Sequence, residues 1–436
     1  MFKAKTSLVS HTMGSYIAFQ PGSRFANRCG MVKDVYVSGH KAYGVMIELP
    51  NMFRLNFEVP RTEKVTLMPK TKVDLALKKI NPLSYIGSIS YGGFTIGTDP
   101  ELFVVDEHNV VIPAFTFLPT KKKAHEGISG MGNRAYMPYW DGFQGEWNTS
   151  PGYSCLGYLT DQVHHGMQEL YKAAREKFPK ARLTTACVVE IPEKMMKDAD
   201  FEFVQLGCAP SLNVYNVDPI EVPDARDLHI RFAGCHLHFG STLRQGETWD
   251  VSIKALDSVI GMVMTSLLAG LEDPRRRHFY GKAGEYRLPK HGFEYRVPSS
   301  ALLCHPTVFH LCFDLARVVV SIARYLDFDR VWKAKEEEVV EIINNVDVKG
   351  ARRILRKNKS TLEAILNKKY TGYTVYSHPH KKIVPFIMGG ITEFFNVKDM
   401  VKTWYLDPST RWATHSGNSN CTVDKLDISW FKHEDN

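Results

Sequence analysis

The sequence is 436 residues long, 44% apolar and 23% charged, an ordinary globular composition that allows one large domain with appendages or two to three domains. Its eight cysteines include no Cys-x-x-Cys pair, which argues against a structural zinc site and against a secreted disulfide scaffold. The most apolar window, residues 255–271, is short and contains Asp257, so it predicts a core helix rather than a membrane span. The first 15 residues lack the apolar region of a signal peptide, so we expect a protein of the reducing cytoplasm.

Positive charge is concentrated near the N-terminus. Residues 1–85 contain 13 Lys and Arg against 5 Asp and Glu, a net charge of +8 that equals the charge of the whole chain. The remaining residues are therefore neutral in sum. An acidic or nucleic-acid partner is expected to bind this N-terminal segment, unless its charge serves only to keep a small domain soluble.

The N-terminal segment has the pattern of a small β-barrel. Within residues 14–68, Val, Ile, Tyr and Phe alternate with polar residues between Gly, Pro and Asn turns, which predicts about five short strands. Such a set of strands favours an SH3-like barrel. We therefore predict a basic barrel over residues 1–68, followed by a linker over residues 69–90.

The rest of the chain mixes strands and helices. Strands are predicted at 94–106, 110–115, 183–191 and 231–239, and a strand pair is predicted around Gly292. Helical patterns cover 155–178, 250–271 and much of 305–370. We expect an α+β catalytic domain over 91–330, with a helical and mixed extension over 331–436 packed on it.

Polar residues recur as pairs two positions apart in the predicted strands. Residues i and i+2 of a strand point to the same face of a sheet. Taken singly, each pair fits a solvent-facing strand, satisfied polar residues or a salt bridge, whereas several such pairs together indicate a site. The pairs are Asp99 with Glu101, His236 with His238, and Glu294 with Arg296, and a fourth segment adds Asp141 and Glu146.

Converging carboxylates need cations, because they repel each other and burying an unpaired charge costs several kcal/mol. Oxygen ligands favour Mg²⁺, and mixed His and carboxylate sets also suit Mn²⁺. A zinc site with an open position stays an alternative for His236, His238 and one carboxylate. Pro100 has no N–H to donate, so we expect its strand to be an edge, a strand start or bulged, with Asp99 turned partly away from the cation.

The common nucleotide and hydrolase signatures are missing: the chain has no GxxxxGK[ST], no GxGxxG between strand and helix, no HExxH and no GxSxG. A basic segment with Lys122 at its centre precedes GISGMG. Its backbone N–H groups and Lys charge could hold a phosphate, and a mobile surface loop is an equal alternative.

Five segments in this order resemble the phage-type amidoligases, the carboxylate–amine ligases of type 2 in the glutamine synthetase and glutamate–cysteine ligase superfamily. The segments are GTDPELF, DGFQGEWN, GCAPSLNVY, RFAGCHLHFG and YGKAGEYRLPKHGFEYRVPSS, and the resemblance covers roughly residues 94–330. It implies a curved antiparallel sheet with helices packed outside. It also implies that ATP phosphorylates a carboxylate and that an amine then attacks the acyl phosphate, giving an amide, ADP and phosphate.

The resemblance also implies roles for the paired residues. We expect the cations, Mg²⁺ or Mn²⁺, to be held by acidic residues and one histidine, while Arg296 neutralises the transferred phosphoryl group and Asn148 lies beside the second acidic segment. Glu285 and Arg287 form a further pair that would hold the acceptor amine or support Glu294. The predicted metal ligands are Asp99, Glu101, Glu146, His236 and Glu294; the predicted ATP-binding residues are Lys122, His236, Arg287 and Arg296; the predicted catalytic residues are His238, Glu294 and Arg296.

Two other functions compete with a ligase. A metal-dependent hydrolase or oxygenase would use His236, His238 and a carboxylate, and would act without ATP. A non-catalytic nucleic-acid-binding or virion-associated protein would act through the basic N-terminal segment, with salt-sensitive binding that survives mutation of the acidic residues. For the ligase, the sequence does not identify the carboxylate and amine, which are small molecules, peptides or proteins, or nucleobases.

Overall fold

The computed structural model describes part of the chain. The described residues are 6–7, 15–21, 29–38, 42–48, 56–60, 64–72, 94–126, 137–151, 156–204, 211–215, 225–241, 248–325, 328–366, 369–370, 373–374 and 380–393. The chain divides into two compact units, one made of residues 1–89 and 321–333 and the other of residues 90–320 and 334–436. The GISGMG segment and most of the C-terminal tail lie outside the described residues, and the domain boundaries proposed from sequence stay a prediction.

The first unit contains a six-stranded antiparallel sheet with the order β1-β6-β2-β3-β4-β5. Ile17, Phe19 and Val65 are buried, as the alternating pattern predicts. Closure of these strands into an SH3-like barrel stays a prediction. The strands are β1 Thr6–Ser7, β2 Tyr16–Phe19, β3 Cys29–Ser38, β4 Ala42–Glu48, β5 Asn56–Pro60 and β6 Lys64–Leu67.

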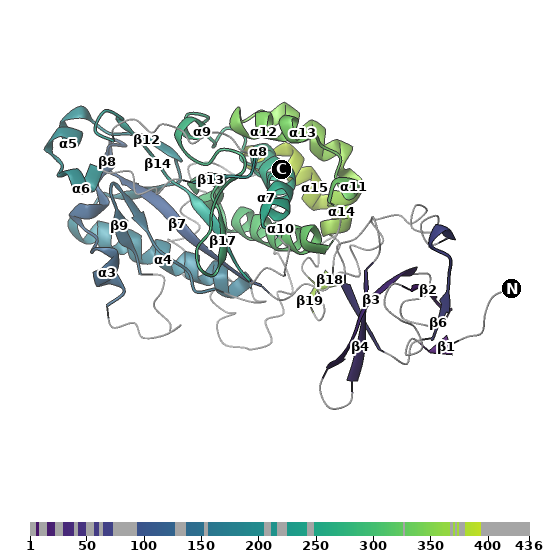
Figure 1. The fold of residues 1–436 in the computed structure, drawn as a ribbon. Coiled ribbons are helices and arrows are strands. Elements are labelled where there is room, and N and C mark those ends of the chain that lie inside the picture. Colours follow the sequence, from purple (N-terminus) through teal and green to yellow (C-terminus); the bar gives the residue numbers. More distant parts are fainter. Residues whose placement is uncertain are drawn as a thin grey trace, which may run out of the picture. The chain divides into compact units, whose positions relative to one another are not determined.

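The second unit is built on a nine-stranded antiparallel sheet, which confirms the expected α+β class with antiparallel strands (Figure 1). Its main path has the order β13-β16-β17-β15-β7-β10-β9, and β8 and β11 also pair with β7. The strands are β7 Thr95–Val105, β8 Val111–Ile112, β9 Tyr139–Asp141, β10 Gln144–Glu146, β11 Arg182–Thr184, β13 Leu212–Asn213, β15 Cys235–Gly240, β16 Glu285–Arg287 and β17 Gly292–Tyr295. Two short pairs lie apart from it, β12 Val188–Glu190 with β14 Ile230–Phe232, and β18 Lys369–Tyr370 with β19 Tyr373–Thr374.

The three segments predicted to be helical contain helices, with a π-helical turn, η3, interrupting the predicted helix over 250–271, and further helices lie outside these segments. None in the described part of the chain combines the length and apolarity that crossing a membrane requires. They are α3 Lys121–Ala124, α4 Leu156–Lys177, α5 Glu193–Asp198, α6 Phe201–Val204, α7 Asp250–Leu256, η3 Asp257–Gly261, α8 Met262–Leu267, α9 Arg276–Phe279, α10 Pro306–Tyr325, α11 Phe328–Val331, α12 Glu336–Asn344, α13 Val348–Lys357, α14 Lys359–Leu366 and α15 His380–Gly389, with 3-10 turns η2 Ala114–Thr116, η4 Ser300–Cys304 and η5 Ile391–Glu393.

Strand β7 is the centre of the large sheet, so the expectation that Pro100 marks an edge, a strand start or a bulge is wrong. β7 lies between β15 and β10, and Pro100 pairs in regular register with Cys235. Strand β10 ends at Glu146, and beyond it Pro100 uses only its carbonyl, which accepts a 3.3 Å hydrogen bond from the Trp147 N–H. The strand therefore continues straight through, and Asp99 keeps its place opposite His236.

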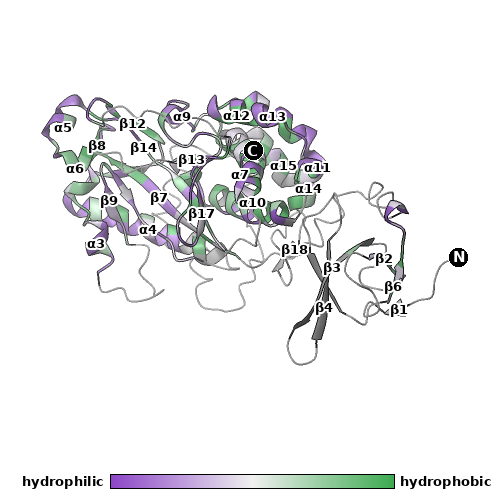
Figure 2. Cartoon of the chain, in the orientation of Figure 1, coloured by the Kyte–Doolittle hydropathy of each residue, from purple (hydrophilic) through white to green (hydrophobic). Residues whose placement is uncertain are grey.

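One face of the sheet is covered by helices. A Cβ on Gly145 would lie 2.6 Å from the Leu170 side chain of α4, so this helix packs directly on β10. Behind β17, the Tyr295 hydroxyl donates a 2.6 Å hydrogen bond to Asp257 of the π-helical turn. Hydrophilic residues concentrate on outer helices such as α5, α12 and α13 (Figure 2). Because Gly145 and Tyr295 alternate with Glu146 and Glu294, those carboxylates project from the other face.

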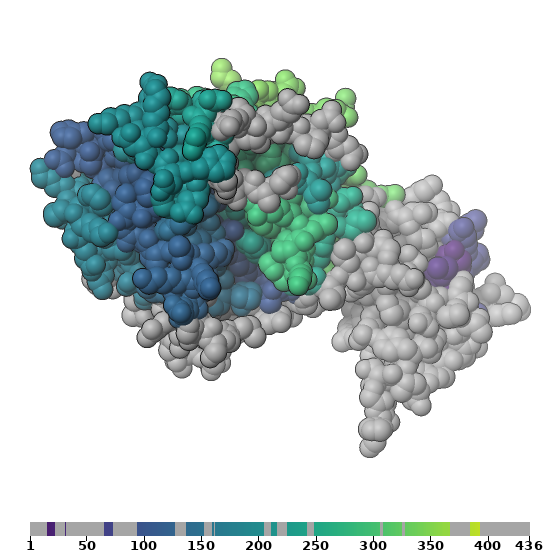
Figure 3. Space-filling model, turned by 60° about the vertical axis from the view of Figure 1, so that its left-hand side comes forward, coloured from purple at the N-terminus to yellow at the C-terminus, as the bar shows by residue number. Residues whose placement is uncertain are grey.

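An apolar cluster joins strand β7 to residues that follow much later in the chain. Phe103 and Val105 of β7 pack with Phe143, Ile191 and Ala233, all of them buried. Figure 3 shows the corresponding blue and teal segments side by side on one face of the molecule. This packing holds the part of β7 that follows Glu101.

Asp257 makes the stability of the second unit sensitive to pH. Burial raises the pKa of Asp257 to about 7. Because this pKa lies above that of the unfolded chain, the folded state binds the extra proton, and stability is lost as the pH rises from about 4 to 7. As the pH rises from 5 to 8, we expect the unfolding free energy of Asp257→Asn to increase by about 2–4 kcal/mol relative to that of the native chain, measured by urea denaturation at each pH. A pH-independent difference would contradict this.

Candidate active site

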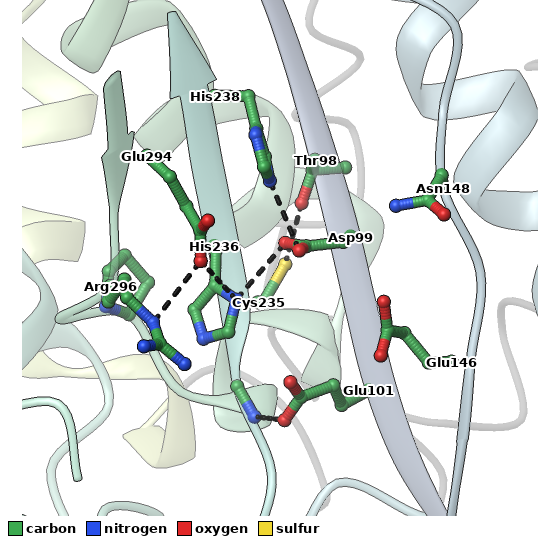
Figure 4. A network of polar contacts seen from close by, with 12 residues as sticks. Thr98, Asp99, Glu101, Glu146, Asn148, Cys235, His236, His238, Glu294 and Arg296 are labelled. Carbon is green, nitrogen blue, oxygen red and sulfur yellow. Dashed lines mark hydrogen bonds and ion pairs between the residues drawn. The ribbon is translucent and has the colours of Figure 1, made fainter. Parts of the chain in front are cut away.

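Strand pairing brings the predicted pairs onto one face of the large sheet (Figure 4). His236 of β15 lies opposite Asp99 of β7, and His238 lies opposite Glu294 of β17. On the other side of β7, Glu101 lies opposite Glu146. Since all these positions share one parity along antiparallel strands, their side chains converge on the face that the helices leave open.

Asp99, His236 and Glu294 form the first group. Their ligand atoms lie within 4.8 Å of one another. The His236 Nδ1 is 3.2 Å from Asp99 Oδ1 and 3.4 Å from Glu294 Oε1, yet these three buried atoms make no hydrogen bond within the described structure. A nitrogen and two carboxylate oxygens that face one another without a shared proton are a donor set for a divalent cation.

Glu101, Asp141 and Glu146 form the second group, again with ligand atoms within 4.8 Å of one another. Glu101 accepts a 2.5 Å hydrogen bond from the Gly234 N–H. The Tyr139 hydroxyl contacts Glu146 Oε1 and, at 2.8 Å, Asn148 Oδ1. An all-oxygen set of this kind suits Mg²⁺ or Mn²⁺.

The second group carries more negative charge than its surroundings neutralise. Burial, then Glu146 and Asp141, raise the pKa of Glu101 well above its ordinary value. Burial, followed by Asp99 and Asp141, raises the pKa of Glu146 to about 8. Burial also raises the pKa of Asp141. These carboxylates therefore repel one another, and a bound cation would relieve that repulsion.

The first group is electrostatically different because the histidines compensate Asp99. Burial opposes ionisation of Asp99, but His238 and His236 hold its pKa below its ordinary value. Burial lowers the pKa of His238, but Asp99 outweighs that effect and the net pKa is raised; the Asp99 Oδ2 lies 3.1 Å from His238 Nε2. Burial lowers the pKa of His236, which favours the neutral imidazole that ligates metals.

The cationic residues differ in access to the site. Arg296 is fully buried, and its guanidinium contacts Glu294 at 3.2 Å, Ser211 at 2.7 Å and the Tyr280 hydroxyl at 3.1 Å. Arg287 is partly exposed and lies 3.9 Å from Glu294. Arg287 is thus the more accessible of the two arginines predicted to meet a phosphate.

At the Glu146 end of the site, the acidic group is contacted by Lys121 and not by the predicted Lys122. Lys121 lies 3.8 Å from Glu146 Oε1 and sits over the Tyr139 ring. Both lysines belong to the exposed first turn of α3, and no contact between Lys122 and either group occurs in the described part of the chain. Glu285 is buried and accepts a 2.8 Å hydrogen bond from the N–H of Gly281, the residue that follows Tyr280.

Sequence reasoning missed Tyr139, Tyr280 and His291. Tyr139 stands two residues before Asp141, so the same i, i+2 spacing could have found it. Tyr280 lies just after α9, outside any strand, and touches both groups. His291, in the turn before β17, lies 3.3 Å from His238 Nδ1. Neither Tyr280 nor His291 has a periodic signal in the sequence.

Residues 228–406 match the family described as phage phiEco32-like COOH.NH2 ligase-type 2. The matched stretch includes His236, His238, Glu294 and Arg296. Strand β7, with Asp99 and Glu101, lies outside it. No curated protein matches the chain. Solved structures do, among them one titled GmaS/ADP complex-Conformation 1, at 12% identity and a TM-score of 0.32, covering 77% of this chain and 83% of that chain.

The family match falls on the segment that carries the His-x-His and Glu-x-Arg strands. Two of the five segments that carry the resemblance, RFAGCHLHFG and YGKAGEYRLPKHGFEYRVPSS, lie in the matched stretch, and the other three lie outside it. The match confirms that resemblance: over residues 228–406 the chain is similar to the carboxylate–amine ligases of type 2, which join a carboxyl group to an amine.

Proposed function

We propose that the chain joins a carboxylate to an amine through an acyl phosphate formed from Mg-ATP on the open face of the large sheet. The observation that carries this proposal is the presence there of two three-residue groups of metal-ligand atoms, Asp99, His236 and Glu294 in one and Glu101, Asp141 and Glu146 in the other. In the proposed reaction a carboxylate oxygen takes the γ-phosphoryl group. The amine nitrogen then attacks the acyl carbon, phosphate leaves, and a proton is lost.

Each group would hold one divalent cation, Mg²⁺ or Mn²⁺. Buried, mutually repelling carboxylates support this for the second group, and the unbonded His236 Nδ1 beside two carboxylate oxygens supports it for the first. Bound cations would neutralise the phosphate oxygens of ATP, which is the main demand of phosphoryl transfer.

We assign the remaining roles by access. Arg287, partly exposed beside Glu294, would contact a phosphate or the acceptor substrate, and the buried Arg296 would hold Glu294 in place. His238, next to Asp99 and His291, would contact a phosphate or substrate from the same face. Lys121 is in position to meet ATP at the Glu146 end of the site, and Lys122 remains a candidate beside it.

The basic N-terminal segment suggests how an acidic target would reach the enzyme. We propose that its net charge of +8 binds an acidic or nucleic-acid-linked partner. Binding of a labelled oligonucleotide to the whole chain should then weaken steeply between 50 and 200 mM salt, by about tenfold or more. Binding that is absent or insensitive to salt would contradict the proposal.

The ligase reaction is tested by incubating the purified protein with Mg-ATP, hydroxylamine as a surrogate amine, and a desalted extract of small molecules and peptides. ADP and acyl hydroxamate should form in equal amounts, and only when the extract is present. ADP without hydroxamate would indicate simple hydrolysis of ATP. Consumption of extract components without ATP would instead favour a metal-dependent hydrolase or oxygenase.

A further inference from the structure

We propose that Tyr280 is a positioning residue that organises both groups at once, because its hydroxyl joins His236 of the first group to Glu101 of the second. This inference rests on the proposed function, in which each group holds a cation. The Tyr280 hydroxyl contacts His236 Nε2, lies 3.4 Å from Glu101 Oε1, and accepts a 3.1 Å hydrogen bond from Arg296.

The direction of each contact follows from what these groups can donate and accept when Glu101 is ionised, as it would be beside a bound cation. A phenol hydroxyl has one proton to donate and oxygen lone pairs with which to accept. Arg296 can only donate, and an ionised Glu101 can only accept. All three contacts are satisfied when the hydroxyl donates to Glu101 and accepts from both Arg296 and the His236 Nε2–H.

This arrangement determines which nitrogen of His236 faces the carboxylates with a lone pair. With the proton on Nε2, the neutral ring presents an unprotonated Nδ1 toward Asp99 and Glu294. That agrees with the missing hydrogen bond at Nδ1. The hydrogen bond made by one nitrogen of a histidine sets which nitrogen binds a metal. Tyr280 therefore prepares His236 as a ligand and steadies Glu101 with the same hydroxyl.

The Tyr280 ring is held firmly enough for this role. It is buried, and the guanidinium carbons of Arg276 and Arg296 lie 4.6 Å and 4.9 Å from its centroid. The His236 ring meets it edge-on, with centroids 5.4 Å apart. Gly281 follows at φ +71°, where a Cβ would clash with Arg276, so the chain turns sharply just after the tyrosine. Removing only the hydroxyl should leave this packing intact.

The test compares Tyr280→Phe with Tyr139→Phe, a matched loss of one hydroxyl that contacts Glu146 of the second group and Asn148 beside it. Mn²⁺ binding is measured by calorimetry in a Glu294→Gln background, which isolates the second group, and in a Glu146→Gln background, which isolates the first. We expect Tyr280→Phe to weaken Mn²⁺ binding about tenfold in both backgrounds. Tyr139→Phe should weaken Mn²⁺ binding only in the Glu294→Gln background.

The His236 tautomer provides an independent measurement. In ¹⁵N-histidine-labelled protein without metal, at a pH at which Glu101 is ionised, the native chain should show His236 protonated at Nε2 alone, and Tyr280→Phe should lose this preference. The His236→Gln variant identifies the signal. An unchanged tautomer, or weaker Mn²⁺ binding in one background only, would overturn the role of Tyr280. A native chain that binds no Mn²⁺ would overturn the proposed cation sites instead, and the tautomer would then decide the role of Tyr280.

Discussion

Replacing Glu294 with glutamine should lower extract-dependent ADP formation by at least about 100-fold while the protein remains folded. One oxygen of this side chain, Oε1, lies within 3.4 Å of His236 Nδ1 and 3.2 Å of Arg296 Nε. Glutamine keeps the shape of the side chain, but it removes the charge that would bind a cation. The loss should therefore appear in turnover, measured as initial rates at saturating Mg-ATP.

The control for Glu294→Gln is the same change at Glu193, an exposed residue of α5 that pairs only with Lys197 within the described structure. Glu193→Gln should retain full activity. Circular dichroism and the urea midpoint should show both variants folded. A folded Glu294→Gln enzyme with native rates would remove Glu294 from the site and, with it, the first group.

The i, i+2 spacing of polar residues was sufficient to predict which side chains share a face, but not which of them meet. Asp99 and His236 are opposite each other only because β7 and β15, more than 130 residues apart, pair in one register. A shift of one residue would turn every such side chain to the other face. Local pattern therefore predicted the members of the two groups, while their division into two depends on long-range pairing.

Pro100 shows where a local rule failed. The rule that proline avoids central strands holds when its missing N–H would break a ladder. Here Pro100 takes part through its carbonyl, which accepts a 3.3 Å hydrogen bond from the Trp147 N–H just after β10 ends, and that bond needs no proline N–H. Which backbone groups meet depends on long-range strand pairing, which a single sequence indicates poorly.

Tyr280 illustrates the other kind of residue that local pattern does not find. Its segment, between α9 and β16, has neither helical nor strand periodicity. Its place in the site comes from packing against Arg276 and Arg296. The SH3-like barrel and the tail are different again, because much of both lies outside the described residues and their predicted folds stay predictions.

The region around β17 depends on a buried ion pair whose loss should be among the most destabilising single changes. Arg277 lies 3.2 Å from Glu272 Oε2, both side chains almost fully buried, and it also donates to the carbonyls of Val297 and Gly281. Ser299 adds a hydrogen bond to the same carboxylate. We expect Arg277→Met to lower the unfolding free energy by about 3–5 kcal/mol, because it leaves the Glu272 charge buried without a cation.

The double variant Arg277→Met with Glu272→Leu separates the ion pair from the rest of the packing. Since a buried pair replaced by apolar residues often costs little, the second change should recover at least half of the loss in urea denaturation. A single variant within 1 kcal/mol of the native chain would show that the pair is not desolvated. Val297 and Gly281 directly follow Arg296 and Tyr280 in sequence, so Arg277→Met should also weaken Mn²⁺ binding, linking the stability of this buried turn to the geometry of the site.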